Sequence, residues 1–335
     1  MALPDRPSRR IVIAGASSLL GNELKSLLEE SRFADADLRL LDEDVAAGTL
    51  TEASGEATLI QPVEEGSFYR ARAVFFTGSS EFTRANFIAA RRAGAKVIDL
   101  SGGEVEQRNS VAWFPKLDWL LAREFPKEVA SYAVPSAGGT AGAALTLALE
   151  RVGLRRLALV LFQSVSEAGR PGIEELETQT GQLLSFQGVG QPVFDAQVAF
   201  NMLDRYGAGS RLRLQVARDR IRREVEASLR PNTPVPAIRV LHAPVFYGAT
   251  FTACAELDPH ASAERIRESC SQAGFLVTEE DGPGPSNVSA AGEKSILLAP
   301  PEADPALGGT WWFWGAADNI RVPAANAVKL AEMLV

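Results

Sequence analysis

The first residues with a spacing suited to chemistry are glycines that follow an apolar run near the start of the chain. Gly15 and Gly21, in Gly-Ala-Ser-Ser-Leu-Leu-Gly, have the outer spacing of a dinucleotide-binding turn, with Ser18 at its middle position. In such a turn glycine lets backbone N–H groups approach a pyrophosphate, which the helix N-terminus also attracts. A tight turn that serves packing alone has the same spacing. The segment therefore predicts either a dinucleotide site or a structural turn.

Carboxylates stand where the ribose of such a dinucleotide would lie. Leu41 is followed by Asp42, Glu43 and Asp44 at the end of the second predicted strand. A carboxylate accepts hydrogen bonds from ribose hydroxyl groups and repels a 2′-phosphate. These residues therefore favour NAD over NADP as the cofactor, and the alternative is a solvated acidic turn.

A second glycine-rich turn, residues 136–142, brings hydroxyl groups close to backbone N–H groups. The N–H groups of Gly138 and Gly139 could bind an anion or stabilise an oxyanion. Ser136 as a nucleophile would need an adjacent base, whereas a serine before a helix ordinarily caps that helix. Bases and thiols are scarce, because the chain has two histidines and two cysteines: His242, His260, Cys254 and Cys270.

The elements that must position these residues alternate regularly in the first part of the chain. Apolar strands that alternate with helices, such as the helical pattern at 82–94, are typical of a parallel sheet covered on both faces. The sequence thus predicts a doubly wound α/β domain of the Rossmann type over residues 1–130, with NAD(P) as its ligand. Its predicted strands are 10–16, 38–42, 57–62, 73–78 and 96–102.

Beyond residue 130 the pattern changes to that of a mixed sheet with helices. The segment 238–258 is too long and too rich in β-branched residues for a buried parallel strand, and predicts extended structure instead. A charged helix is predicted over 211–229, and 281–293 has the Pro, Gly and Ser content of an exposed loop. We therefore expect an α+β domain with a mixed sheet over 131–317, and a last helix within 318–335 that returns to the first domain.

Composition excludes several classes of protein. The 335 residues carry 34 Lys and Arg against 42 Asp and Glu, a formal net charge of −8. Binding of nucleic acid or an anionic membrane needs a positive field, so neither partner is expected. No apolar run approaches the ~18 residues of a membrane span, and the polar start predicts no secretion signal. Two cysteines cannot form a cysteine-rich zinc site, so we expect a metal-free cytoplasmic protein that binds a small molecule.

Several motifs, in this order, resemble those of the aspartate-semialdehyde dehydrogenase family. The family's glycine turn is similar to residues 15–21, its turn after the fourth strand to Thr77-Gly78-Ser79, and its VIDxS motif to 97–101. The resemblance implies a dimeric, two-domain oxidoreductase that uses NAD(P) to interconvert aspartyl phosphate and aspartate semialdehyde in amino-acid biosynthesis. Similar segments in the second half are 162–180, 196–201 and 318–332.

The residues that this family uses for catalysis are replaced. In the family a cysteine thiolate at a helix N-terminus attacks the aldehyde or acyl phosphate, and this chain has Ala137 at the matching position. The catalytic histidine matches Ala249, and the arginine that holds the substrate carboxylate matches His242. Gln163 matches a glutamine of the substrate pocket and is retained. Because a methyl group can neither attack a carbonyl nor move a proton, the resemblance implies loss of the family reaction.

Three functions remain open from the sequence. The first is an inactive homologue that binds a dinucleotide or a small anion, with Arg220 as an anion contact, or that acts as a partner subunit. The second is an active oxidoreductase on a related substrate, with Tyr247 or His242 as the proton acceptor. The third is a structural partner that binds no nucleotide. A pair of Ser136 with His242 would supply a nucleophile and its base, and capping by Ser136 is the alternative.

The resemblance divides the expected site residues into two groups, with no metal ligand and no intact catalytic residue. It also implies a homodimer, with 131–317 as the dimerisation and substrate domain. The cofactor-binding group is Gly15, Ser17, Ser18, Leu19, Leu20, Gly21, Asp42, Thr77, Gly78 and Asn319. The substrate or anion group is Ser136, Gly138, Gly139, Gln163, Arg220 and His242.

Overall fold

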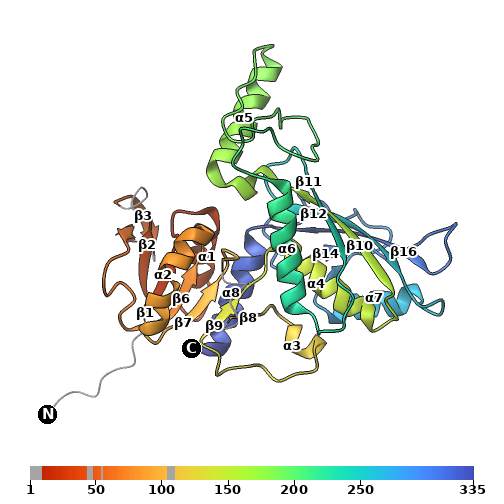
Figure 1. Ribbon diagram of the computed structural model, residues 1–335, viewed down its shortest axis with the longest axis horizontal. Helices are drawn as coiled ribbons and strands as arrows, with labels where there is room; N and C mark the ends of the chain where they lie inside the picture. The colour runs from red at the N-terminus through yellow and green to blue at the C-terminus, as the bar shows by residue number, and fades with distance from the viewer. Residues whose placement is uncertain (1–9, 44–47, 54–55, 104–109) are drawn as a thin grey trace. The chain divides into compact units, whose positions relative to one another are not determined.

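The chain divides into two compact units in the computed structural model (Figure 1). The structure describes residues 10–43, 48–53, 56–103 and 110–335. Unit 1 takes its described residues from Met1–Phe114, Pro126–Val134 and Ala324–Val335. Unit 2 consists of Pro115–Phe125 and Pro135–Pro323, and each unit has a sheet of its own.

Unit 1 is built on a seven-stranded sheet of order β5-β2-β1-β6-β7-β9-β8, in which neighbouring strands pair in parallel. The predicted doubly wound α/β fold is therefore confirmed. Helix α1 (Leu19–Glu29) follows β1 and helix α2 (Ser80–Arg92) follows β6, and α8 (Arg321–Leu334) belongs to the unit from Ala324 onward. The strands are β1 (Arg10–Ala14), β2 (Asp37–Asp42), β5 (Gln61–Pro62), β6 (Ala71–Phe76), β7 (Lys96–Asp99), β8 (Ser110–Ala112) and β9 (Ser131–Ala133).

The strand predicted at 57–62 is wrong in its extent. Strands β3 (Leu50–Ala53) and β4 (Glu56–Leu59) form a separate antiparallel pair, and only β5 joins the parallel sheet. β5 contains Pro62, which has no N–H group, and it lies at the edge of the sheet, where a missing donor is tolerated.

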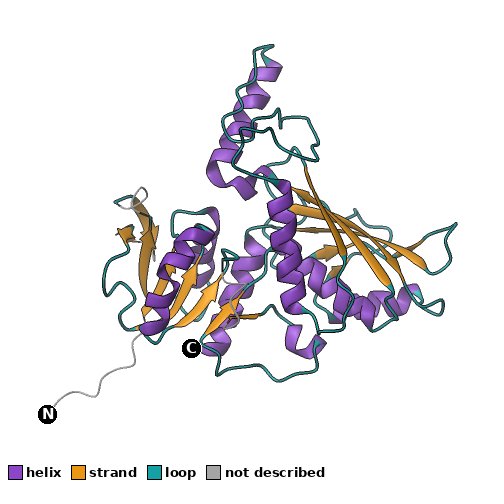
Figure 2. Ribbon diagram, viewed as in Figure 1, coloured by secondary structure: helices purple, strands orange, loops and turns teal. Residues whose placement is uncertain are grey.

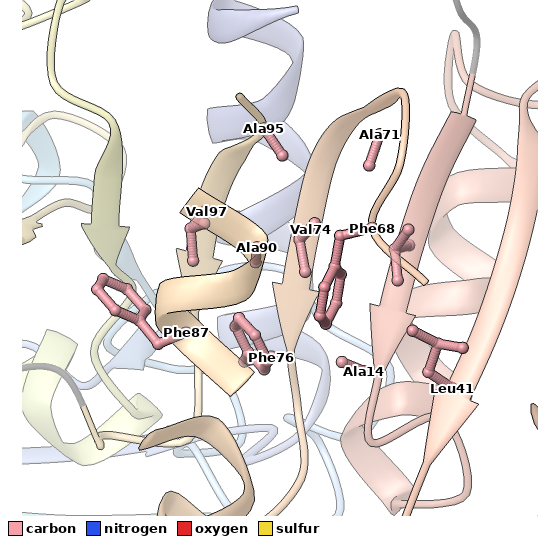
Figure 3. Close-up of a cluster of buried hydrophobic side chains, with 11 residues drawn as sticks. Ala14, Leu41, Phe68, Ala71, Val74, Phe76, Phe87, Ala90, Ala95 and Val97 are labelled. Atoms are coloured by element: carbon pink, nitrogen blue, oxygen red, sulfur yellow. The ribbon is translucent and has the colours of Figure 1, made fainter. Parts of the chain in front are cut away.

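The core of unit 1 consists of side chains from adjacent parallel strands and the helix that covers them (Figure 3). The strands are buried on both faces, which explains their continuous apolar sequence. Phe87 and Ala90 of α2 pack against this layer, as does Phe68 before β6. The cluster contains Val12, Ala14, Leu41, Phe68, Ala71, Val74, Phe76, Phe87, Ala90, Ala95 and Val97.

Unit 2 is built on a mixed sheet of order β11-β10-β12-β16-β14-β13, to which β15 adds beside β16. The segment predicted as one extended stretch, 238–258, forms two strands, because Gly248 with φ +96° turns the chain between them. β10 pairs in parallel with the first and antiparallel with the second. The strands are β10 (Arg156–Gln163), β11 (Ala237–His242), β12 (Ala249–Glu256), β13 (Leu276–Val277), β14 (Leu297–Leu298), β15 (Glu302–Ala303) and β16 (Thr310–Ala317).

Helix α4 (Ala137–Glu150) packs against β10 and against α6 (Leu214–Ser228), and α6 confirms the charged helix predicted from the sequence (Figure 2). A Cβ atom at Gly138 would meet both Leu161 of β10 and Ile221 of α6. A helix that is apolar all round is suited to this buried position. The remaining helices of the unit are α3 (Leu117–Leu120), α5 (Gly169–Leu184), α7 (Ala263–Gln272) and the 3₁₀ helix η1 (Val165–Ala168).

We expect Gly15→Ala to destabilise the protein much more than Gly48→Ala. Both glycines have positive φ (+99° and +87°), where a side chain costs about 1–2 kcal/mol. At Gly15 a Cβ atom would also lie 2.1 Å from the backbone N of Gly78, whereas no atom lies within 4 Å of a Cβ at Gly48. The clash adds ~1–3 kcal/mol. Urea unfolding of both variants measures the difference, and equal losses would contradict this account of the turn.

Candidate functional site

The glycine turn of unit 1 lies where the sheet order reverses. β1 pairs with β2 on one side and with β6 on the other, and in such sheets ligands bind outside the carboxyl ends of these strands. Gly15 touches the Thr77–Gly78 backbone after β6, and Thr77 Oγ1 donates to Gly15 O at 2.9 Å. Ser18 caps α1, its Oγ accepting from Gly21 N at 2.9 Å. The predicted residues from Gly15 to Gly21 and from Thr77 to Gly78 thus form one surface.

Asp42 fixes this turn through its carboxylate. Its Oδ2 accepts from Ser17 N at 2.6 Å and its Oδ1 accepts from Glu43 N at 2.8 Å, and only 6% of the residue is exposed. Glu43 in turn accepts from Ser79 Oγ, the N-cap of α2, at 2.8 Å. Asp42 and Glu43, the carboxylates predicted to bind a ribose, therefore lie directly beside the two turns. Asp44, predicted with it, is outside the described residues.

In unit 2 the N-terminus of α4 binds a carboxylate of the chain itself. Ser136, the N-cap, donates from its N and from its Oγ to Oε2 of Glu224, at 3.1 and 2.5 Å. The Ser136 Oγ also accepts from Gly139 N at 3.1 Å, so capping accounts for the hydroxyl group. Ala137, at the position of the family cysteine, is 2% exposed.

Glu224 reaches this position from α6, where it pairs with Arg220 one turn earlier. The Arg220 Nε donates to Glu224 Oε1 at 2.8 Å, and the Glu224 side chain is only 1% exposed. A Cβ atom on residue 139 would lie 2.2 Å from Glu224 Oε2, so glycine is required there. Of the groups predicted to bind an anion, Ser136 and Arg220 are thus bonded to an internal carboxylate, and Gly139 N is bonded to Ser136 Oγ. Gly138, beside them, packs against Leu161 and Ile221.

The end of β10 and the start of β12 bring the other substrate positions together. Gln163 pairs with Ala249 across the antiparallel strands, so the retained glutamine adjoins the position of the family histidine. Asn319 lies beside them: its Oδ1 accepts from Gly248 N at 2.8 Å, directly before Ala249. Its Nδ2 donates to Ser166 Oγ at 3.0 Å and to Glu167 Oε1 at 2.9 Å. The side-chain amide of Asn319, predicted to contact a cofactor, therefore has both its oxygen and its nitrogen hydrogen-bonded within unit 2.

Glu167 is a residue that sequence reasoning missed. Its side chain reaches solvent, but loss of solvation among the surrounding protein raises the pKa of its carboxyl group. The hydrogen bond from Asn319 and the charge of Arg220 lower that pKa, while the charge of Glu224 raises it. Glu224 was missed as well, although its spacing of four residues from Arg220 on one helix face is the signal of an ion pair.

His242 lies in an aromatic cluster and not beside Ser136. Its ring centroid is 5.6 Å from that of Tyr206 and 5.9 Å from that of Phe194. The Tyr206 hydroxyl lies 3.3 Å from His242 Nδ1, and Val198 O lies 3.5 Å from Nε2. Burial lowers the pKa of His242 to about 4 and raises that of Tyr206 above its ordinary value. The imidazole is therefore neutral at pH 7, and the proposed pairing with Ser136 is wrong because Ser136 donates to Glu224.

The described residues contain neither a candidate metal site nor a candidate membrane-spanning helix. No group of three or more His, Cys, Asp or Glu side chains is arranged there to hold a metal ion. Within the same residues, no helix is both long enough and apolar enough to cross a membrane.

The fold and this arrangement define a protein of the semialdehyde dehydrogenase class. The semialdehyde dehydrogenase dimerisation domain matches residues 145–322, more than half of the chain, so the chain belongs to this family. A USG-1 protein homolog of Pseudomonas aeruginosa is 30% identical over 334 residues, covering 97% of both chains. Aspartate-semialdehyde dehydrogenase 2 of Vibrio cholerae is 26% identical over 97% of both. The structure of a probable aspartate-semialdehyde dehydrogenase from Pseudomonas aeruginosa superimposes with a TM-score of 0.86, at 27% identity and 98% coverage of each chain.

We expect His242 to make the protein less stable in mild acid. Its pKa is about 4 in the folded chain and about 6.5 when unfolded, so stabilisation is complete above pH 6.5. About 2–3 kcal/mol of the free energy of unfolding is lost as the pH falls from 6.5 to about 4. His242→Gln removes this slope in urea unfolding across that range. His260→Gln, at the exposed second histidine, leaves it unchanged; a slope that persists in His242→Gln would contradict the assignment.

Proposed function

We propose that this protein is a homologue of aspartate-semialdehyde dehydrogenase that binds a dinucleotide but does not catalyse the thiol-dependent reaction of that family. One observation carries the proposal: methyl groups, those of Ala137 and Ala249, stand at the two positions where a thiolate and an imidazole are required. Loss of a covalent nucleophile costs on the order of 10⁶ in kcat, and loss of the base adds little because the residues act as a unit.

The surroundings of Ala137 support the same conclusion. A helix N-terminus activates a thiol or binds an acyl phosphate through its N–H groups and its positive end. Here Ser136 N and Oγ are bonded to Glu224, and the charge of Arg220 is paired with the same carboxylate. An incoming phosphate would have to displace a carboxylate that is 1% exposed, which leaves that ion buried without partners.

The residues of unit 1 fit a dinucleotide, and they fit NAD better than NADP. Gly15 and Gly78 bring two turns together at the reversal of the sheet order, where α1 begins. Residues from Gly15 to Gly21 would hold the pyrophosphate, and Asp42 and Glu43 the ribose. A 2′-phosphate beside these carboxylates would be repelled. When bound, the nicotinamide would supply hydride chemistry, and the free thiols of unit 2, Cys254 and Cys270, lie on β12 and α7 and not at the start of α4.

An apolar sheet face in unit 2 supports a homodimer, in a protein that we expect to be cytoplasmic. On β10, β12 and β16 one set of side chains faces the helices, while Ala158, Cys254 and Trp312 stand in register on the other face. Trp312 and Trp314 remain 42% and 39% exposed, and large exposed apolar patches mark interaction surfaces. The matching family domain is the dimerisation domain, so a second copy is the proposed occupant.

The function is tested by turnover and by nucleotide binding in parallel. With aspartate semialdehyde, phosphate and either NAD⁺ or NADP⁺, we expect kcat at least ~10⁵-fold below that of a homologue with the cysteine. The enzyme from Vibrio cholerae is the assay control. Turnover at ordinary enzymatic rates would refute the proposal.

In the binding arm, NAD⁺ at ~100 times its Kd stabilises the fold by about 2.7 kcal/mol, and NADP⁺ at the same concentration stabilises it less. Thermal unfolding measures both shifts. Absence of a shift with either nucleotide would favour a structural partner that binds none, and a larger shift with NADP⁺ would overturn the preference argued from Asp42.

The dimer is tested by placing a charge on the sheet face. We expect Trp312→Glu to halve the mass measured by light scattering after size exclusion, because an unpaired carboxylate in an apolar interface is strongly disfavoured. Ile88→Glu, at another exposed apolar position, on α2 of unit 1, is the control and keeps the wild-type mass. A wild-type protein that is monomeric at micromolar concentration would contradict the proposal.

A further inference from the structure

Within the described residues, the outer edge of strand β11 is paired at one position. β11 is the edge strand of the unit 2 sheet, and β10 pairs with its inner edge (Figure 1). On the outer edge His242 N donates to Leu203 O at 2.8 Å, and Leu203 N donates to His242 O at 3.4 Å. An unbroken antiparallel strand would next place Gly207 opposite Ile238, but Gly207 N donates to Phe194 O at 3.1 Å. The chain therefore leaves this edge soon after Leu203.

Two residues of β11 keep their backbone groups open along this edge. The N–H and C=O groups of successive strand residues point to opposite edges. His242 points outward, and Ala243 N donates inward to Gln163 O at 2.9 Å, so Val240 and Ile238 point outward as well. In the described part of the chain these outward groups have no hydrogen-bond partner. Two donors and two acceptors thus remain for water or for another chain.

A cavity of about 360 Å³ lies at these open groups. Asp204, where the chain leaves the edge, forms one border of it. Helix α6 packs against β11 and supplies Leu214, Gln215 and Arg218 to the wall. Pro236, directly before β11, has no N–H group, so the open edge ends there. The space and the backbone groups therefore suit a short extended segment, and not a long strand.

The border of this cavity is basic in a protein that is acidic as a whole. Residues 204–223 contain seven Arg and two Asp, whereas the whole chain has a net charge of −8. Asp204 lies 3.2 Å from Arg205 Nε and 3.9 Å from Arg239 Nη2, so one carboxylate serves two guanidinium groups. The side chain of Arg218 is 43% exposed beside Asp219. An acidic ligand complements the charge of this border.

We propose that the outer edge of β11 binds an extended acidic peptide segment of another protein, which adds to the sheet as a short strand. The peptide backbone pairs with the N–H and C=O groups of Ile238 and Val240, and its carboxylates pair with Arg218 and Arg239. In this mode of recognition the backbone hydrogen bonds give affinity and the side chains give specificity. The site belongs to unit 2 and the dinucleotide turn to unit 1, so the proposal goes beyond the proposed function.

Two other occupants fit this edge less well. A nucleic acid would satisfy the arginines, but its phosphodiester backbone has no N–H groups for the open carbonyls of β11. Edge-to-edge pairing of two copies of this chain would bring two basic borders together, and like charges in an interface are strongly disfavoured.

The experiment measures peptide binding to the full-length protein by fluorescence anisotropy. The probe is a labelled pentapeptide, acetyl-Glu-Val-Glu-Val-Glu-amide, whose length matches β11 between Pro236 and His242. We expect a Kd below about 1 mM, and at least ~10-fold weaker binding when lysine replaces each glutamate. N-methylation at the central residue keeps every charge but removes one backbone donor. It should weaken binding ~10-fold, because a carbonyl of β11 then has no partner.

Arg218→Gln tests the protein side and should weaken the acidic peptide ~3-fold, as suits one exposed ion pair. The matched control is Arg267→Gln on α7, which packs against β13 at the other end of the sheet. Both arginines lie on helices of unit 2 beside one carboxylate, with side chains 43% and 37% exposed. The control should leave the affinity unchanged.

Several results would overturn the proposal. Among them are absence of saturable binding, equal affinity for the acidic and basic peptides, no effect of N-methylation, and equal weakening by the two arginine variants. Tighter binding of a polyuridine oligonucleotide would assign the edge to nucleic acid instead. A fall in the mass measured by light scattering when the peptide binds would assign it to a second copy. Since no nucleotide or turnover is involved, each of these results leaves the proposed function standing.

Discussion

The buried carboxylate of Glu224 is the constraint on which the rest of unit 2 depends. An ion that is 1% exposed costs several kcal/mol unless each oxygen is paired, and Glu224 meets this need with Ser136 and Arg220. The same contacts tie α6 to the start of α4 and require glycine at position 139. The packing of α6 against α4 thus depends on a carboxylate that takes up the N-cap of α4.

Unit 1 uses a carboxylate at its turn as well, with a different consequence. Asp42 accepts from Ser17 N and so orders the glycine turn, and Glu43 does the same for the N-cap of α2. These carboxylates border the surface where the sheet order reverses and leave the glycines themselves unobstructed. Carboxylates at such an edge can accept hydrogen bonds from ribose hydroxyl groups, and this is the physical basis of the proposed preference for NAD.

The strand pairing of unit 2 brings together several of the residues that the resemblance singles out. The register that sets Gln163 against Ala249 is intact, and Asn319 still fixes Gly248 before it. The imidazole that remains, His242, is enclosed with Phe194 and Tyr206, where it is neutral and has no substrate proton to accept. Membership of the family therefore describes the fold, and the side chains at a few positions decide what that fold can do.

The sequence alone determined the parallel sheet followed by a mixed sheet, because buried strands and the order of motifs are local properties of the chain. It could not place Glu224 on Ser136, which lies 88 residues away, or join Glu167 to Asn319 at a separation of 152. It also offered His242 as a partner for Ser136, since polarity on a strand does not reveal its neighbours. Those pairings follow from which strands and helices pack together, and only the tertiary structure decides that.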